Sequence, residues 1–266
     1  MKITMLFSGS EGNCALINDD DTKILIDAGG CTKRIKTSLE NIGTSLCDIS
    51  AVFITHEHTD HTKALYTLSK SYDIPIYTAV GTAREICSLK KAPRTSLEKV
   101  ARLIRTVEAE QPYEIGSFLI TPFEIPHDAA SPLGFEIKSQ TTNKRITYAT
   151  DTGSVIRSML PHFEGCDMAL IESNHDIEML KNGPYPEFLK TRILSAVGHL
   201  SNENASRFAV WLSKNGTKKI ALAHLSRENN TPDTAESFTK TALFEANCTD
   251  TSISLALQDK ICEVEI

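Results

Sequence analysis

Hydrophobic residues along the chain come in short runs that end at turn-forming or ionisable residues. Such runs, four to eight residues long and rich in Ile, Val, Leu, Phe and Thr, are typical of β-strands. In the first half of the chain they are KITMLFS, CALINDD, TKILIDAG, AVFIT and PIYTAV. Residues 61–72 instead carry Leu65, Leu68 and Tyr72 at helical spacing, which predicts a helix after the fourth run.

Turn-forming residues separate the first three predicted strands. The stretches Ser8–Asn13 and Asp19–Asp21 are rich in Ser, Gly, Asn and Asp, so each predicts a turn. A second helix is expected to begin at Thr82. The segment 91–112 is charged and has no clear period, and we expect it to be a surface excursion.

The second half repeats this pattern of strands and helices. Its strand-like runs are SFLITPFEI, LGFEIKS, RITYAT, MALIES, KIALAHLS and SISLALQD. Ser201 is a good N-cap for a helix that runs through Trp211 and stops near Asn215 and Gly216. Thr231, followed by Pro232, is a good N-cap for a helix through about Ala246. Strands and helices in both halves, with no Pro-, Gly- or Ser-rich linker, predict an α/β fold and a single domain over residues 1–266.

Composition and charge limit the classes of protein. The chain has 266 residues, of which 41% are hydrophobic and 23% charged, and its formal net charge is −6. A sequence pI of about 5.8 means that no overall basic field would attract nucleic acid. A polyanionic substrate would therefore have to be held locally.

Targeting signals and cysteine usage predict a cytoplasmic protein. The apolar run at the start is too short for a signal peptide, and no run is long enough to span a bilayer. The seven cysteines are widely spaced and form no C-x-x-C pair, so we expect free thiols in a reducing compartment.

Ligand-type residues follow the ends of several predicted strands. They are His56, His127 with Asp128, Asp151, Asn174 with His175, and His224. The ends of strands at one edge of a sheet are where α/β folds place ligands and chemistry. With His58 and His61, which follow His56 closely, six of the eight histidines lie at such positions, and the other two are His162 and His199. This arrangement indicates a functional site rather than scattered histidines.

The densest cluster of such residues is HEHTDH, at residues 56–61. In an extended segment His56 and His58 point the same way and can reach one metal, whereas Asp60 and His61 start a helix and can reach a second. Glu57 points away from both. Imidazole and carboxylate together suit zinc, iron or manganese. His127 and His224 could complete one metal each, and Asp151 is suited to bridge two ions about 3.5–4 Å apart.

The order and placement of these residues resemble the metallo-β-lactamase superfamily over nearly the whole chain. HEHTDH resembles its H-x-H-x-D-H motif, and IPHDA, ATDTG and LAHLS match its later His, Asp and His. The resemblance implies a four-layer αββα sandwich of two mixed β-sheets flanked by helices. It also implies one metal on His56, His58 and His127, a second on Asp60, His61 and His224, and Asp151 as the bridge.

Other stretches resemble the WalJ/YycJ branch of that superfamily. They are FSGSEGNC, ESNHD and GHLSNENA. This resemblance implies a phosphodiesterase with 5′→3′ exonuclease activity on duplex DNA. True β-lactamases have Cys or another residue where this chain has Asp151, and they carry a signal peptide, so antibiotic hydrolysis is not expected.

The expected mechanism uses a hydroxide bridging two divalent metal ions to attack phosphorus. Asp60 would serve as both ligand and proton acceptor. His175 and His199 are the candidates for protonating the leaving group. Each also has a structural interpretation: His175 could support the ligands by hydrogen bonding, and His199 could cap the helix that starts at Ser201.

The SGSEGN loop is a candidate for substrate binding. Ser8, Ser10 and Asn13 offer groups that can bind an anion, although a tight turn is an equally good explanation of the loop. Lys63, Arg157 and Arg227 lie close in sequence to the metal motifs and could meet phosphates, although solvent-exposed charge is the more common role.

Two other functions fit the same residues. The first is a hydrolase of this fold that acts on a small cyclic phosphodiester or a thioester, and the second is a metal-bound regulatory module without turnover. Lys and Arg clustered beside the metal edge would favour DNA, whereas a deep, closed pocket would favour a small substrate. The sequence predicts neither the native metal nor the oligomeric state.

Overall fold

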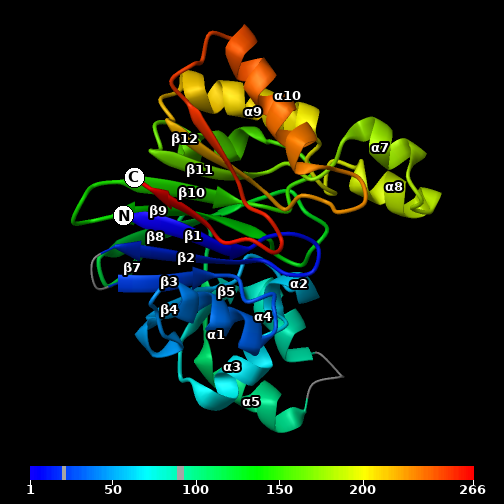
Figure 1. Ribbon diagram of the computed structural model, residues 1–266. Coiled ribbons are helices and arrows are strands. Elements are labelled where there is room, and N and C mark those ends of the chain that lie inside the picture. Colours follow the sequence, from blue (N-terminus) through cyan, green and yellow to red (C-terminus); the bar gives the residue numbers. More distant parts are fainter. Residues whose placement is uncertain (20–21, 89–92) are drawn as a thin grey trace.

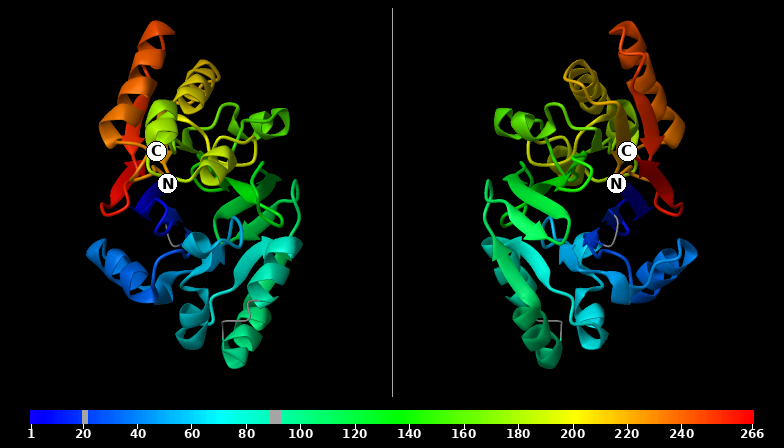
Figure 2. Two further views of the ribbon diagram at one scale, coloured as in Figure 1. Left: turned by 90° about the vertical axis from the view of Figure 1, so that its right-hand side faces the viewer. Right: turned by 90° about the vertical axis from the view of Figure 1, so that its left-hand side faces the viewer.

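The computed structural model describes residues 1–19, 22–88 and 93–266. In these ranges two mixed β-sheets face each other, and helices cover the outer face of each sheet (Figure 1). The side views in Figure 2 show the same order of layers, with strands between two sets of helices. The expected four-layer αββα sandwich is therefore confirmed.

The first sheet is built mainly from the N-terminal half of the chain. In spatial order it contains β14 (Cys262–Glu265), β1 (Lys2–Phe7), β2 (Cys14–Asp19), β3 (Thr22–Ile26), β4 (Ala51–Phe53), β5 (Ile76–Ala79) and β6 (Ile104–Val107). The pairs from β14 to β3 are antiparallel, and those from β3 to β6 are parallel.

The second sheet mirrors this plan. In spatial order it contains β13 (Ser252–Leu255), β12 (Lys219–Ala223), β11 (Met168–Glu172), β10 (Arg145–Ala149), β9 (Leu133–Ser139), β8 (Phe118–Glu124) and β7 (Tyr113–Ile115). The pairs from β13 to β10 are parallel, and those from β10 to β7 are antiparallel.

Helices form the two outer layers. Those that follow strands of the first sheet are α1 (Thr32–Asn41), α2 (Thr59–Thr62), α3 (Leu65–Ser71), α4 (Val80–Ser88) and α5 (Arg94–Leu103). The others are α6 (Leu160–Phe163), α7 (Ile177–Asn182), α8 (Glu187–Ile193), α9 (Asn202–Lys214) and α10 (Pro232–Glu245). Short 3₁₀ turns lie at Leu46–Asp48 and Arg157–Met159. The two predicted N-caps are confirmed, since the hydroxyl of Ser201 accepts from Asn204 N–H and that of Thr231 from Thr234 N–H.

Strand alternation explains the core. In β3, Ile24 and Ile26 pack between the two sheets, whereas Leu25 packs against the outer helices with Ile35 of α1. Both faces of the central strands are therefore buried, which is why these strands appear in the sequence as nearly continuous apolar runs. A third cluster packs α6, α9 and α10 against the second sheet.

The structure corrects the prediction for residues 91–112. Within this segment lie the whole of α5 and the whole of β6, which forms one edge of the first sheet. An outer helix and an edge strand bury few side chains, Val100 and Val107 among them, so their apolar pattern is weak. Residues 91 and 92, and Asp20 and Asp21 of the expected turn, lie outside the described residues. The helices α1, α7 and α8 and the strand β14 were not predicted.

Parallel strands bring the candidate residues to one edge. Because β9 is antiparallel to both β8 and β10, the strands β8, β10, β11 and β12 all end at the same edge of the second sheet. This edge meets the end of β4 beside α2, and α7 and α8 project next to it as an arm (Figure 1). No helix of the described residues is long and apolar enough to cross a membrane.

Candidate metal centre

The seven predicted metal ligands converge at this edge in two groups. We call them the histidine group (His56, His58 and His127) and the mixed group (Asp60, His61, Asp151 and His224). Within each group the candidate ligand atoms lie within 4.8 Å of one another. Residues that come from both sheets and lie far apart in the sequence thus form one candidate site.

In the histidine group, three ring nitrogens point at one another. His58 Nδ1 lies 3.0 Å from His56 Nε2 and 3.3 Å from His127 Nε2. Nitrogens at the corners of a tetrahedral zinc site are about 3.3 Å apart, given Zn–N bonds of about 2.0–2.1 Å. The spacing therefore fits a common metal ion.

The opposite nitrogens of this group fix the tautomers. His127 Nδ1 lies 3.2 Å from the carbonyl oxygens of Val197 and Gly198, which can only accept, so Nδ1 carries the proton. His56 Nδ1 lies 3.0 Å from the Thr55 hydroxyl, which donates its own hydrogen to Asp27 and so accepts from His56. In both residues Nε2 is left with its lone pair toward the centre, as metal ligation requires.

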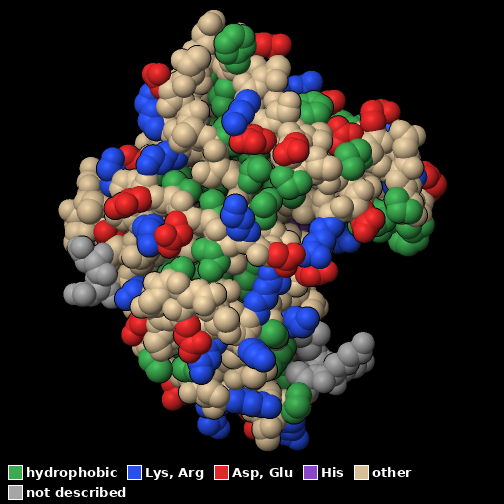
Figure 3. Space-filling view, viewed as in Figure 1, with side chains coloured by type: hydrophobic (Ala, Val, Ile, Leu, Met, Phe, Trp, Pro, Cys, Tyr) green, Lys and Arg blue, Asp and Glu red, His purple; other side chains and the backbone are tan. Residues whose placement is uncertain are grey.

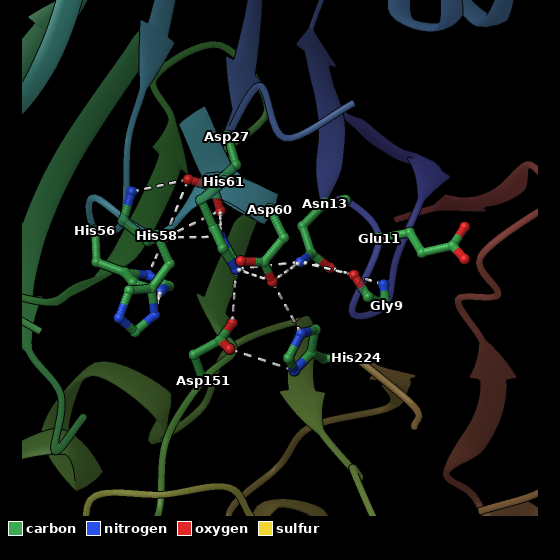
Figure 4. A network of polar contacts seen from close by, with 12 residues as sticks. Gly9, Glu11, Asn13, Asp27, His56, His58, Asp60, His61, Asp151 and His224 are labelled. Atoms are coloured by element: carbon green, nitrogen blue, oxygen red, sulfur yellow. Dashed lines mark hydrogen bonds and ion pairs between the residues drawn. The ribbon is translucent and has the colours of Figure 1, made fainter. Parts of the chain in front are cut away.

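In the mixed group, Asp151 lies between the two histidines (Figure 4). Its Oδ2 is 3.1 Å from His61 Nε2, and its Oδ1 is 3.3 Å from His224 Nδ1. Asp60 Oδ2 is 3.4 Å from His61 Nε2 and 3.6 Å from His224 Nε2. Two carboxylates and two imidazoles therefore surround one point.

Unpartnered buried atoms support a cation here. In the described part of the chain, neither Asp151 Oδ2 nor His224 Nε2 makes a contact with hydrogen-bond geometry, although both are buried and Asp151 Oδ2 lies 3.1 Å from His61 Nε2. Such atoms cost about 1–3 kcal/mol each unless something satisfies them. A divalent ion would satisfy both, and the nitrogen and oxygen donors are those that zinc, manganese and iron accept.

Asp27 is a supporting residue that the sequence analysis missed. Its Oδ2 accepts from His61 Nδ1 at 2.7 Å, and its Oδ1 accepts from Thr55 N–H at 2.9 Å. A carboxylate behind a ligating histidine fixes the ring and makes it a better ligand. Asp27 comes just after β3, so the rule of ionisable residues at strand ends would have found it. Asp27, Asp151 and His224 also have φ near +60°, a strain often found at functional sites.

Glu172, the last residue of β11, is the second missed residue. Its Oε1 accepts from both His199 Nδ1 and His224 Nδ1 at 2.8 Å, and its Oε2 accepts from Thr152 N–H and Leu200 N–H. Burial favours the neutral acid, but the two histidines outweigh it and lower the pKa of Glu172 to about 2. Since His224 Nδ1 faces Glu172, its Nε2 is the atom left for a metal.

Protonation differs between the two groups. Burial and neighbouring histidines lower the pKa of His56, and burial lowers that of His127. Burial has the same effect on His61 and His224, but nearby carboxylates outweigh it and raise the pKa of both well above the usual value. The histidines in turn hold the pKa of Asp151 well below its usual range.

The two candidate general acids lie in different surroundings. His199 lines the recess beside the ligands, and although burial opposes its charge, Glu172 raises its pKa. His175 is buried, neither of its ring nitrogens has a partner among the described residues, and burial lowers its pKa to about 4. His175 is therefore neutral at pH 7, and the structure does not bring it into either group.

The SGSEGN loop supports the ligands from the N-terminal side. The Ser8 hydroxyl accepts from His224 N–H at 2.9 Å and donates to Asn13 Oδ1. Asn13 Nδ2 lies 3.1 Å from His61 Nε2. Ser8 and Asn13 are therefore both buried, and their side chains contact other residues of the protein. Ser10 alone of the three predicted substrate contacts is exposed and lines the recess. Substrate binding stays a prediction, and the geometry favours Ser10 for it.

A recess of about 230 Å³, which we call the metal recess, opens over the two groups. One wall is a face of the arm, formed by Tyr185, Leu189 and Arg192. Arg192 Nη2 donates to Asp128 Oδ1 at 2.9 Å, which ties the arm to the residue after His127. Glu57 points elsewhere, as expected, and accepts from Ala130 N–H at 2.8 Å.

Comparison with known proteins agrees with this geometry. A family model described as "Beta-lactamase superfamily domain" matches residues 22–224. The chain is 33% identical over 243 residues to "Exodeoxyribonuclease YycJ" of Bacillus anthracis, covering 88% of this chain and 86% of that protein. It is 35% identical over 234 residues to "Exodeoxyribonuclease WalJ" of Streptococcus pneumoniae, covering 88% and 85%. The crystal structure of unliganded yeast PDE1 superposes with a TM-score of 0.73 at 15% identity over 98% of both chains.

Proposed function

Because this chain belongs to the β-lactamase superfamily and is a hydrolase of that fold, we propose that it degrades DNA as a metal-dependent 5′→3′ exonuclease. Two relatives over most of its length are named exodeoxyribonucleases. The observation that carries the proposal is the pairing of the histidine group with the mixed group. We expect residues 1–266 to act as one catalytic domain.

The two groups would hold two divalent ions. His56, His58 and His127 would bind one ion, and Asp60, His61 and His224 the other, with Asp151 between them. Ions in these positions would lower the pKa of a shared water toward neutrality and offset the charge that develops on the phosphate oxygens. The supporting residues Asp27 and Glu172 would keep the rings of His61 and His224 aimed at the centre.

The chain supplies the groups that move protons. Asp60 is charged at all working pH values, because His61 and His224 outweigh its burial and lower its pKa. One of its oxygens could therefore ligate while the other accepts a hydrogen bond from the attacking water, although the lowered pKa makes Asp60 a weak acceptor for the proton itself. We assign protonation of the leaving oxygen to His199, because it lines the metal recess and Glu172 raises its pKa. The low pKa of His175 argues against that role.

The surroundings of the metal recess favour a polymer over a small substrate. A second recess, which shares Ser10 and Asp60 with the first, carries Arg34 and Lys63. Basic side chains beside the metal edge are the local feature that a polyanion needs in a protein whose net charge is −6.

The proposal can be tested with metal-reconstituted protein on end-labelled substrates. We expect Mn²⁺- or Zn²⁺-loaded protein to release mononucleotides from the 5′ ends of duplex DNA, and also to cleave bis-p-nitrophenyl phosphate. Chelated protein should do neither. Cleavage of the small ester with intact DNA ends would contradict the nuclease function, and loss of label from 3′ ends would contradict the polarity.

A further inference from the structure

A second recess lies next to the metal recess. Its volume is about 440 Å³, and Ser10 and Asp60 line both recesses. A ligand in it would therefore be one side chain away from the metal ligands. We call it the basic recess, because Arg34 and Lys63 form part of its wall.

Lys63 gives this recess a positive charge that has no carboxylate partner among the described residues. It is exposed at the end of α2, and no carboxylate within residues 1–19, 22–88 and 93–266 lies close enough to pair with it. The other acid of the wall besides Asp60 is Glu11, which lies 3.4 Å from Arg227. Lys63 is thus available to an anion.

Arg34 is held in place rather than mobile. Its guanidinium stacks over the Phe7 ring at 4.1 Å, donates to the carbonyl oxygen of Gln258 and lies 3.4 Å from the exposed Asp259 Oδ1. A guanidinium fixed in this way needs little reordering to meet an anion. The first turn of α1 contains no acidic residue, so the positive end of this helix adds to the field of Arg34 and Lys63. Figure 3 shows Lys and Arg side chains around the hollow beneath the arm.

We propose that the basic recess binds a phosphate group of the substrate strand that neighbours the phosphate being cut. The inference rests on the proposed function, because the metal centre would hold the scissile phosphate. A second contact of this kind would explain how an acidic protein grips a polyanion. It would also select strands over small diesters, since a small diester carries no second phosphate.

Single variants separate this contact from the metal centre. Lys63→Ala removes the unpaired positive charge, and Lys63→Arg keeps it. Lys70, an exposed lysine of α3 that lines neither recess, provides the matched control Lys70→Ala, with the same change in net charge. Lys63 is exposed, so its loss should leave the melting temperature unchanged.

The substrates differ in the number of phosphates they carry, and TpT and pTpT differ in nothing else. TpT has one internal phosphate, pTpT adds a 5′-terminal phosphate, TpTpT adds an internal one, and bis-p-nitrophenyl phosphate has a single phosphate. In the wild type we expect the added phosphate to raise kcat/KM by about tenfold, the value of one charged hydrogen bond. Lys63→Ala should abolish that gain while keeping wild-type rates on the two single-phosphate substrates. A gain with pTpT alone would assign the recess to the strand terminus, and a gain with TpTpT alone to the internal backbone.

Binding gives a readout that does not depend on turnover. Anisotropy of a labelled duplex, measured in an Asp151→Ala background, should show that Lys63→Ala lowers the slope of log K against log salt by about 0.7–0.9. Lys70→Ala and Lys63→Arg should keep the slope. Equal slopes and equal phosphate gains in Lys63→Ala and the wild type would overturn the phosphate site. If the wild type leaves DNA and the dinucleotides intact, the proposed function fails, and the slopes still decide whether the recess binds a phosphate.

Discussion

The histidine group and the mixed group lie side by side, yet they differ in charge. The first has only imidazoles, and the opposite nitrogens of His56 and His127 face a hydroxyl and backbone carbonyls. The second contains two carboxylates, and the opposite nitrogens of its histidines face two more, Asp27 and Glu172. The mixed group therefore carries the negative charge of the centre. We expect electrostatic attraction to contribute most to ion binding in the mixed group, and the arrangement of the three ring nitrogens to contribute most in the histidine group.

Removing Asp151 should reduce activity most. This side chain belongs to the mixed group and is also the one proposed to lie between the two ions, so its loss should affect both. We expect Asp151→Ala to reduce turnover of bis-p-nitrophenyl phosphate by about a thousandfold or more. Metal analysis should show fewer bound ions per chain. Turnover near the wild-type rate with full metal content would contradict the shared role of Asp151.

Glu172→Gln should separate the two groups. The amide cannot accept from two histidines with the strength of the carboxylate, so His224 and His199 lose their orientation. We expect a loss of about 10–100-fold in activity or in the affinity of the mixed group for its ion. The histidine group should keep its affinity, which can be measured in a Glu172→Gln, Asp60→Asn variant. Equal weakening of both groups would mean that Glu172 acts on overall stability.

Proton release should distinguish the groups more finely. In the metal-free protein the carboxylates raise the pKa values of His61 and His224, so these histidines keep a proton to higher pH than the others, and binding an ion there should release more protons, up to about two. His56 and His127, with lowered pKa values, release none. As pH falls, affinity should thus decrease more steeply in the mixed group. Calorimetry in buffers of different ionisation enthalpy, on Asp60→Asn and His127→Ala, measures this. Equal proton release would contradict the comparison.

His162 tests the effect of carboxylates on a histidine away from the centre. It lies 3.0 Å from Glu136 and 3.1 Å from Glu110, and these hydrogen bonds outweigh burial and raise its pKa. Its contribution to stability is complete below the unfolded pKa of about 6.5 and is lost as pH rises through the folded value. We expect His162→Gln to remove at most about 1 kcal/mol at pH 6 and almost nothing at pH 9. Urea unfolding at the two pH values checks this, and an equal loss at both would show a packing effect.

Local sequence predicted the parts of the site that depend on strand ends. The rule selected His56, His127, Asp151 and His224, which the structure brings together, and it would also have found Asp27 and Glu172. It could not find Tyr185, Leu189 and Arg192, because α7 and α8 are short and largely exposed and leave no apolar period. Arg34 reaches the basic recess only because α1 packs beside Phe7, a contact that depends on tertiary structure. Ser8 and Asn13 were expected to bind substrate, but their contacts with His224 and His61 appear only in the fold.

The most direct test of two metal-binding groups is anomalous diffraction from crystals of the metal-loaded protein. We predict two peaks, one surrounded by His56, His58 and His127, and the other by Asp60, His61 and His224, with Asp151 between them. Glu172 and His199 also lie within ligand range of Asp151 and His224. A single peak among Asp151, Glu172, His199 and His224 would contradict the account, since it would make Glu172 a ligand rather than a support.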